Sequence, residues 1–245
     1  MIQLLEIKNV DVKNKNTYRL KNINLTLRQG EKVALLGKSG SGKSSLISLS
    51  NGSLKPSEGE VKWQGQNINS LKQKQRIDIA TLWQDLRLIE ELNVGQNVNA
   101  GELGKHGILW ALRNLIGNID KKKTIHHLNS VGLSKELLYC NLNKLSGGQL
   151  QRVAIARLLR QSAKFMLVDE PLSNLDPATS DKIIELLLCP QKQLINVPET
   201  CLISLHRPEI IKHFTKVVGL YKGEIVLNKP VHKVNSADIN LIYQA

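Results

Sequence analysis

The segment Gly37-Lys38-Ser39-Gly40-Ser41-Gly42-Lys43-Ser44 constrains the fold of this chain more than any other part of the sequence. It matches the pattern G-x-x-x-x-G-K-[ST], whose glycines let successive backbone N–H groups surround a phosphate. The pattern requires a buried strand before it and a helix after it. Lys32–Leu36 is an apolar run too short for a helix, and a helix is predicted from about Ser44. The sequence therefore predicts a nucleotide site in which Lys43 reaches the β- and γ-phosphates and Ser44 binds Mg²⁺.

The spacing of the other apolar runs predicts an α/β fold. Leu4 to Val12 and Ile23 to Leu27 alternate in polarity and are joined by a polar turn, so they predict an antiparallel pair of strands. Further strands are predicted at Phe165–Val168, at Thr200–Ser204 and at Val217–Leu220. Because helical segments separate these runs, we expect a mainly parallel sheet with an antiparallel flank at the N-terminus.

The spacing of apolar residues changes after residue 84. Residues 94–98, 108–116 and 125–131 have helical spacing and are separated by glycines and by the triplet Lys121–Lys123. We therefore expect a helical subdomain over residues 85–145, inserted into a nucleotide-binding core formed by residues 1–84 and 146–245. Near the end of that core, Pro190 and Pro198 are expected to break the chain between a helix and the strand at Thr200.

Two further segments have residues suited to binding ions. Phe165–Val168 is an apolar strand followed directly by Asp169 and Glu170, a pair suited to holding the magnesium shell and to polarising a water molecule. In Leu145-Ser146-Gly147-Gly148-Gln149, Ser146 is a good N-cap for a helix running to about Arg160. That helix start is a second site for an anion, and one nucleotide does not need two such sites in one chain.

These segments together resemble an ATP-binding cassette (ABC) ATPase, whose signature motif is L-S-G-G-Q. The resemblance covers essentially the whole chain and implies a P-loop NTPase core with an inserted helical subdomain. It also implies roles for single residues. Gln84 matches the glutamine that contacts Mg²⁺ and the attacking water, Ser173 and Asp176 match the D-loop, and His206 matches the switch histidine. The implied nucleotide-binding set is Gly37, Lys38, Ser39, Gly40, Ser41, Gly42, Lys43, Ser44 and Ser45, with Tyr18 as the aromatic residue on adenine.

The roles implied for the site are catalysis by Glu170, His206 and Gln84, and magnesium binding by Ser44, Gln84 and Asp169. The signature residues Leu145, Ser146, Gly147, Gly148 and Gln149 are expected to act on ATP held by a second copy of the chain. In the family two cassettes pair head to tail, so a homodimer is expected. Its implied partners are permease subunits, which dock beside Gln84 and the helical subdomain, and indirectly a solute-binding protein.

The segment from Asn93 to Gly104, followed by Trp110, resembles the corresponding sequence of phosphonate-import ATPases. The resemblance implies uptake of a phosphonate, a phosphite or a phosphate ester, at the cytoplasmic face of the inner membrane. An exporter, another importer or a cell-division complex remains an alternative. No run of about 20 apolar residues predicts a membrane span, and no secretory signal is expected.

The net charge of +13 invites a nucleic-acid hypothesis. The segment 146–205 has equal numbers of bases and acids, so the excess lies in residues 1–84, 85–145 and 206–245. Aromatic residues do not alternate with the bases as they do in single-strand platforms. We therefore favour attraction to ATP and to an anionic membrane surface, and no nucleic-acid partner is expected.

Overall fold

The computed structural model describes residues 2–15, 17–189 and 196–243 of the chain. The chain divides into two compact units. Unit 1 comprises Met1–Lys72, Met166–Glu170 and Glu199–Ala245, and unit 2 comprises Gln73–Phe165 and Pro171–Pro198. The predicted boundaries of the helical subdomain, at residues 84 and 145, are not tested by this division and stay a prediction.

The first sheet of unit 1 is the antiparallel flank predicted from the sequence. Its strand order is β2-β1-β4-β5, with bounds β1 (Gln3–Asn14), β2 (Thr17–Arg28), β4 (Glu58–Trp63) and β5 (Gln66–Asn67). Leu5, Ile7 and Val10 of β1 are fully or almost fully buried, as alternation along a half-covered strand requires. The strands are longer than the apolar runs because pairing continues through polar residues as far as Asn14 opposite Thr17.

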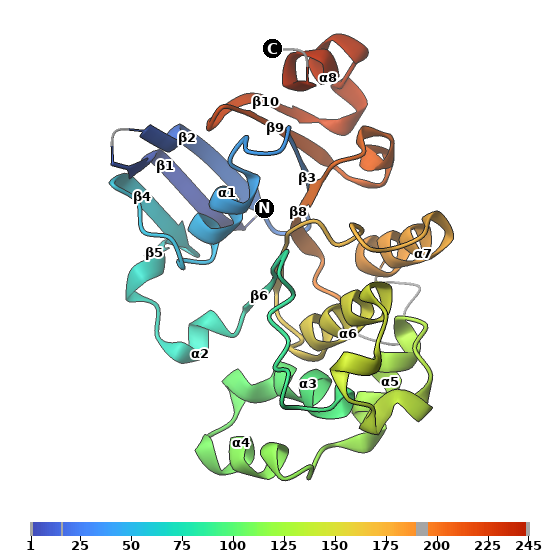
Figure 1. Cartoon of the computed structure of the whole chain (residues 1–245). Helices are drawn as coiled ribbons and strands as arrows, with labels where there is room; N and C mark the ends of the chain where they lie inside the picture. The colour runs from blue at the N-terminus through green and yellow to red at the C-terminus, as the bar shows by residue number, and fades with distance from the viewer. Residues whose placement is uncertain (1, 16, 190–195, 244–245) are drawn as a thin grey trace. The chain divides into compact units, whose positions relative to one another are not determined.

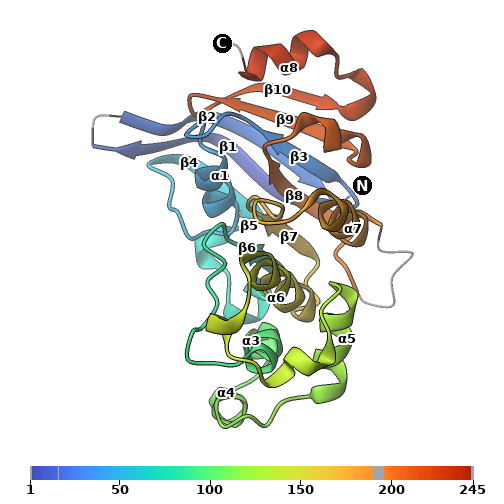
Figure 2. The same cartoon turned by 45° about the vertical axis from the view of Figure 1, so that its right-hand side comes forward.

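The second sheet carries the candidate site. In unit 1 its strands follow the order β10-β9-β3-β8-β7 (Figure 2). The strands are β3 (Lys32–Leu36), β7 (Phe165–Val168), β8 (Thr200–Leu205), β9 (Lys216–Tyr221) and β10 (Glu224–Pro230). β3 runs parallel to both β8 and β9, whereas β10 is antiparallel to its neighbour β9. Every residue of β7 and β8 is buried, which confirms the mainly parallel sheet.

Helices complete unit 1. α1 (Lys43–Ser50) follows β3, and α8 (Ser236–Tyr243) packs on β9 and β10 (Figure 1). Ile242 of α8 is fully buried and lies against Gly219 of β9. Short 3-10 turns cover Ile68–Ser70, Pro208–His213 and Val231–Lys233. The carboxyl ends of β3, β7 and β8 therefore lead directly into the segments predicted to bind nucleotide.

The described residues of unit 2 form β6 (Ile79–Leu82) and the helices α2 (Gln73–Arg76), α3 (Val94–Asn99), α4 (Ile108–Leu115), α5 (Lys121–Ser130), α6 (Gly147–Arg160) and α7 (Pro177–Leu188). Further 3-10 turns cover Ala100–Lys105, Lys135–Tyr139 and Leu142–Lys144. α3 packs against both α5 and α6. The helices predicted within 94–131 are present, but the lysine triplet does not separate two of them. It forms the first turn of α5, because the side chain of Asp120 caps the helix by accepting from the Lys123 N–H.

The stretch between α7 and β8 includes the prolines predicted to break the helix. α7 ends at Leu188 and β8 begins at Thr200. Residues 190–195, and Pro190 with them, lie outside the described residues. Among the helices that the structure describes, none combines the length and the apolar character needed to cross a bilayer.

Candidate active site

The phosphate loop, defined here as Gly37–Ser44, joins β3 to α1 as predicted. Gly42 is the N-cap of α1 and has a φ of +107°, a backbone conformation that glycine adopts at little cost. A Cβ at Gly42 would lie 3.0 Å from the carbonyl oxygen of Arg19 on β2, so this position also requires a residue without a side chain. Because no side chain caps α1, the N–H groups of its first turn are left for another acceptor.

Lys43 turns its side chain back into this loop. Its Nζ donates to the carbonyl oxygens of Gly37 at 2.9 Å and Lys38 at 3.2 Å, and only 4% of the residue is exposed. Nζ also lies 3.8 Å from Oε1 of Glu170. Burial lowers the pKa of the Lys43 ammonium, while the charges of Glu170 and Asp169 act in the opposite direction. The Lys43 ammonium is thus held inside the phosphate loop, against the carbonyl oxygens at its start.

Asp169 and Glu170 share a buried hydroxyl as a partner. Ser204, fully buried on β8, donates from Oγ to Oδ1 of Asp169 at 2.6 Å. The same Oγ accepts the backbone N–H of Glu170 at 2.9 Å. Ser204 therefore orients the Asp169 carboxylate and fixes the backbone at the next residue. No motif marks Ser204 in the sequence, although it is a polar side chain in an apolar strand, two residues before His206.

Glu170 is the centre of an ion-pair cluster. Its φ of +51° is unusual for a residue that is not glycine, and strain of this kind is found at functional sites. Nε2 of His206 lies 2.5 Å from Oε1 of Glu170, the atom that also faces Lys43. The His206 side chain is 45% exposed, whereas that of Glu170 is 10% exposed. The two residues predicted to be catalytic in unit 1 are thus brought together beside the phosphate loop.

The other nucleotide-binding residues lie around this cluster. Lys38, Ser39, Gly40 and Ser44 are exposed, and Ser45 is partly exposed. Ser41 is buried, and its Oγ has no hydrogen-bond partner among the described residues. Tyr18 is 46% exposed on β2, next to Arg19, whose carbonyl oxygen faces Gly42. Its place near the loop is compatible with adenine stacking, which stays a prediction.

The signature segment, Leu145–Gln149, begins α6 in unit 2. Ser146 is the N-cap, as predicted, and its Oγ accepts the backbone N–H of Gln149 at 3.3 Å. Oε1 of Gln149 accepts the N–H of Ser146 in return at 2.9 Å, forming a capping box. A Cβ at Gly148 would lie 2.9 Å from the carbonyl oxygen of Asn174, so this glycine permits close packing. Both Ser146 and Gly147 are exposed at the positive end of the α6 dipole.

The predicted D-loop lies beside this helix start. Gly147 and Gly148 both face Asn174, which directly follows Ser173 in that loop. Asp176 is the N-cap of α7, because its Oδ1 accepts the Thr179 N–H at 2.9 Å. Hydrogen bonds from the side chain and the N–H of Thr179 lower the pKa of the Asp176 carboxyl. Asp176 therefore has a structural task, and the functional roles predicted for Ser173 and Asp176 stay predictions.

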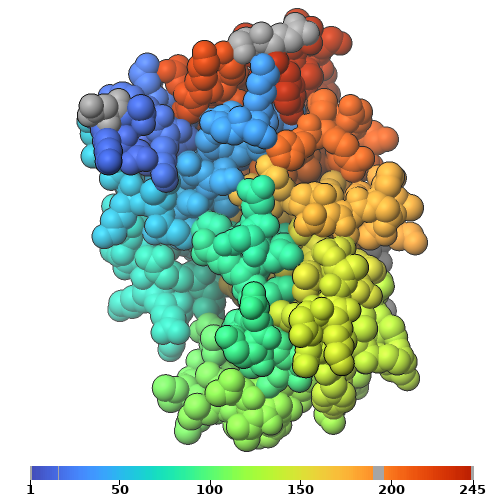
Figure 3. Space-filling model, in the orientation of Figure 1, coloured from blue at the N-terminus to red at the C-terminus, as the bar shows by residue number. Residues whose placement is uncertain are grey.

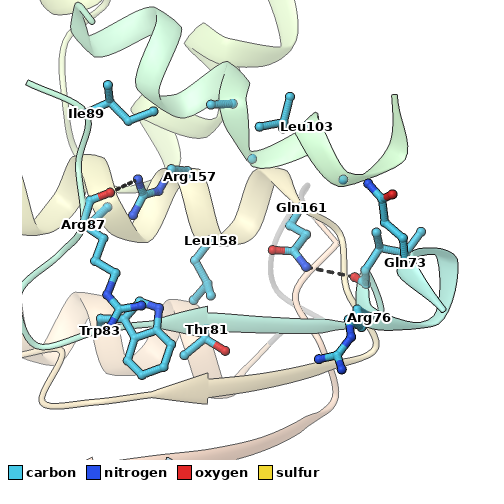
Figure 4. Close-up of a pocket in the computed structure, with 15 residues that line it drawn as sticks. Gln73, Arg76, Thr81, Trp83, Arg87, Ile89, Leu103, Arg157, Leu158 and Gln161 are labelled. Atoms are coloured by element: carbon cyan, nitrogen blue, oxygen red, sulfur yellow. Dashed lines mark hydrogen bonds between the residues drawn. The ribbon is translucent and has the colours of Figure 1, made fainter. Parts of the chain in front are cut away.

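Gln84 is exposed in the turn after β6, also in unit 2. The turn continues into Leu86 and Arg87, which have φ values of +58° and +45°. Arg157 of α6 holds both carbonyl oxygens: Nη1 donates to Arg87 at 2.6 Å and Nη2 to Leu86 at 2.5 Å. The Arg87 guanidinium stacks on Trp83, 3.7 Å from the ring centroid. Figure 4 shows these side chains at one end of a groove of about 440 Å³. No motif in the sequence marks this role of Arg157.

The residues of unit 1 fit a magnesium-bound nucleoside triphosphate. The uncapped start of α1 and the unpartnered Ser41 hydroxyl offer donors to phosphate oxygens. The buried Asp169 carboxylate, 2% exposed, suits a divalent cation. Lys43 supplies a positive charge, and Glu170 with His206 supplies a paired base and imidazole. This set can bind phosphate, orient a water molecule and accept its proton.

Known proteins match this chain along its length. A family model described as "ABC transporter" matches residues 20–173. The phosphonates import ATP-binding protein PhnC of Fusobacterium nucleatum subsp. nucleatum is 36% identical, covering 100% of this chain and 99% of that protein. PhnC 3 of Halalkalibacterium halodurans is 35% identical, covering 98% of this chain and 94% of that protein. The ATP-binding cassette MJ0796, solved as a dimer in a post-hydrolysis state with ADP and Pi, has a TM-score of 0.79 at 29% identity. That match covers 93% of this chain and 99% of the cassette.

Proposed function

The chain belongs to the ABC transporter family, and from this premise we propose that it energises uptake of a phosphonate or a related oxyanion through separate permease subunits. It is the ATPase cassette of such a system. The observation that carries the hydrolytic part is the cluster in which Oε1 of Glu170 lies 3.8 Å from Nζ of Lys43 and 2.5 Å from Nε2 of His206. The solute is proposed from the curated relatives, which are phosphonate-import proteins and align over almost the whole chain.

Each residue of the cluster has a task in ATP hydrolysis. The phosphate loop and the start of α1 bind the phosphates, and Lys43 faces the β- and γ-phosphates. Glu170 orients the attacking water and accepts its proton, while His206 holds the Glu170 carboxylate from its exposed side. Ser44, Asp169 and Gln84 are the proposed magnesium ligands, with Ser204 fixing the Asp169 carboxylate. Magnesium, when bound, neutralises charge on the phosphate oxygens.

A second copy of the chain completes the site. Each chain has one phosphate loop and one signature segment, and α6 begins at the exposed residues Ser146 and Gly147. This exposed, positive end of the helix dipole suits the γ-phosphate of a nucleotide held by the partner. The dimeric structures of MJ0796 support this arrangement. We infer that ATP holds the head-to-tail dimer shut and that hydrolysis to ADP weakens that contact.

Unit 2 transmits this closure to the permease. The Gln84 turn is tied to α6 by the two hydrogen bonds of Arg157, and α6 begins at the signature segment. A displacement of the signature segment therefore moves Leu86 and Arg87 with it. We propose that the permease docks beside this turn on residues 85–145, at the cytoplasmic face of the inner membrane. A solute-binding protein would act on the permease from the other side.

Reconstitution tests the proposal. The chain is combined with its permease subunits in proteoliposomes, and ATP hydrolysis is measured while a solute-binding protein is supplied with a phosphonate, phosphate or sulfate. We expect stimulation that depends on the phosphonate and is lost in Lys43→Ala. Stimulation by sulfate alone would refute the proposed solute and leave the import function standing. Hydrolysis that no permease changes would refute import.

A further inference from the structure

Helix α4 presents its apolar side to solvent. Five of its residues or neighbours lie at helical spacing on one face and are strongly exposed: Ile108 (77%), Leu109 (75%), Leu112 (52%), Leu115 (58%) and Ile116 (81%). We call this set the α4 stripe. The segment around α4, light green in Figure 3, lies at the outer edge of unit 2. A stripe of this size on a helix normally faces a core, so its exposure indicates a partner.

Buried hydrogen bonds attach the opposite side of α4 to the rest of unit 2. Asn114 is 5% exposed, and its Oδ1 accepts from Nδ2 of Asn99 at 2.8 Å. Nε2 of Gln96 donates to the carbonyl oxygens of Asn114 at 2.9 Å and Leu115 at 2.8 Å. Rotating the stripe inward would break this buried network and leave its amides unpaired. The outward direction of the stripe is therefore fixed by the fold.

Basic residues flank the stripe in the sequence. Between residues 100 and 123 the sequence holds five Lys or Arg residues and two acids. The bases, Lys105, Arg113 and Lys121–Lys123, are exposed. Both acids, Glu102 and Asp120, face the buried guanidinium of Arg160, at 2.9 Å and 3.7 Å. Because the five exposed bases outnumber the two acids, which both face Arg160, the segment that carries the stripe is positive overall.

We propose that the α4 stripe lies in the interfacial layer of an anionic lipid bilayer. An apolar helix face flanked by Lys and Arg is the pattern of helices that lie in the membrane surface. Protein hot spots are instead enriched in Trp, Tyr and Arg, whereas the stripe is entirely Ile and Leu. The inference rests on the proposed function, which brings the chain to the membrane, and adds a direct lipid contact to it.

Vesicle binding tests the proposal with the chain alone. The purified chain is mixed with vesicles of phosphatidylglycerol and phosphatidylethanolamine, or of phosphatidylcholine only, and the bound fraction is measured by flotation. We expect binding to the anionic vesicles that weakens as salt is raised. Leu109→Ser with Ile116→Ser should weaken it by about tenfold or more, and Lys122→Ser by about fivefold. Ile2→Ser with Leu241→Ser, which alters two exposed apolar residues of unit 1, is the matched control and should not change it.

Fluorescence gives a second readout. Trp110 lies on the side of α4 away from the stripe and stacks on His106, with ring centroids 4.7 Å apart, so the reporter is placed on the stripe itself. In vesicles with brominated acyl chains, we expect quenching of the added tryptophan emission in Leu112→Trp and none in Leu241→Trp, an exposed position of unit 1. Quenching in Leu241→Trp, or none in Leu112→Trp, would overturn the proposal.

Other outcomes also overturn it. If the chain does not bind anionic vesicles, or if the stripe variant binds as well as the control variant, the stripe does not contact lipid. If the stripe variant loses affinity only for the purified permease in detergent, or only for a second copy, the stripe is a protein interface. ATP hydrolysis stimulated by the permease is measured in parallel, so failure of the lipid contact is separate from failure of the proposed function.

Discussion

Replacing Ser204 with alanine removes one hydroxyl that serves two residues of the proposed site. The change deletes the 2.6 Å hydrogen bond to Asp169 and the acceptor for the Glu170 N–H. A hydrogen bond to a charged group contributes about 1.5–3 kcal/mol, and leaving a buried N–H without an acceptor costs about 1–3 kcal/mol. Loss of a partner that orients a metal ligand lowers metal affinity or activity by about 10–100-fold.

We therefore expect Ser204→Ala to lower kcat by about 10–100-fold and to raise the magnesium concentration for half-maximal activity by a similar factor. ATP binding without magnesium should change little, because Lys43 and the phosphate loop remain. Steady-state hydrolysis over a magnesium titration measures both effects. Ser204→Thr, which keeps the hydroxyl, should recover part of the activity.

Ser50→Ala is the matched control. Ser50 is also fully buried in unit 1, but its hydroxyl has no hydrogen-bond partner among the described residues. This variant should keep its activity and its dependence on magnesium. If Ser204→Ala behaves like Ser50→Ala, or if it changes only thermal stability, then Ser204 does not position the two carboxylates and the reasoning is refuted.

Three more predictions follow from single contacts. Glu170→Gln should bind ATP, accumulate as a dimer and lose about 10²–10⁴-fold in turnover; rapid hydrolysis by this variant would contradict its role as the base. Arg157→Lys keeps the charge but not both hydrogen bonds to Leu86 and Arg87, so permease stimulation should fall several-fold while basal hydrolysis changes less; equal losses would argue against coupling through this turn. Burial lowers the pKa of His127 from 6.5, so the His127 imidazole binds a proton more tightly in the unfolded chain than in the folded one. The free energy of unfolding should therefore fall as pH drops below about 6.5. His127→Gln should reduce that loss between pH 7.5 and 5 in urea unfolding, and an unchanged pH dependence would assign the effect to other groups.

The fold could be predicted where the spacing of apolar residues and the length of an apolar run indicate the same kind of element. Lys32–Leu36 and Phe165–Val168 are short apolar runs, and both are buried strands with the predicted bounds. The strands at Glu58–Trp63 and Ile79–Leu82 were not predicted. The first mixes charged and apolar residues and is stabilised by pairing with β1, which a local pattern does not report. The lysine triplet was misread because its place in a helix depends on the cap at Asp120.

The candidate site could be predicted as a set of motifs but not as a set of contacts. Glu170, His206 and Lys43 were identified from their motifs, whereas Ser204 was missed because its partners directly follow β7, the strand next to β8 in the sheet, more than 30 residues away in the sequence. Arg157 was missed for the same reason, since it reaches back 70 residues to hold Arg87. Such pairings depend on the register of packed elements, and periodicity within one segment carries no information about them.

The most direct test of the account mixes two inactive chains. Lys43→Ala removes the phosphate-loop ammonium, and Gly147→Glu places a carboxylate at the signature helix start, where a Cβ meets only ordinary contacts with Asn174. In a head-to-tail dimer of one of each, the Gly147→Glu chain contributes an intact loop and the Lys43→Ala chain an intact signature. The account predicts that each variant alone hydrolyses almost no ATP and that the mixture recovers up to about a quarter of the wild-type rate per chain, because half of the random dimers hold one intact site of two. A mixture as inactive as its components would contradict the claim that a second copy completes the site.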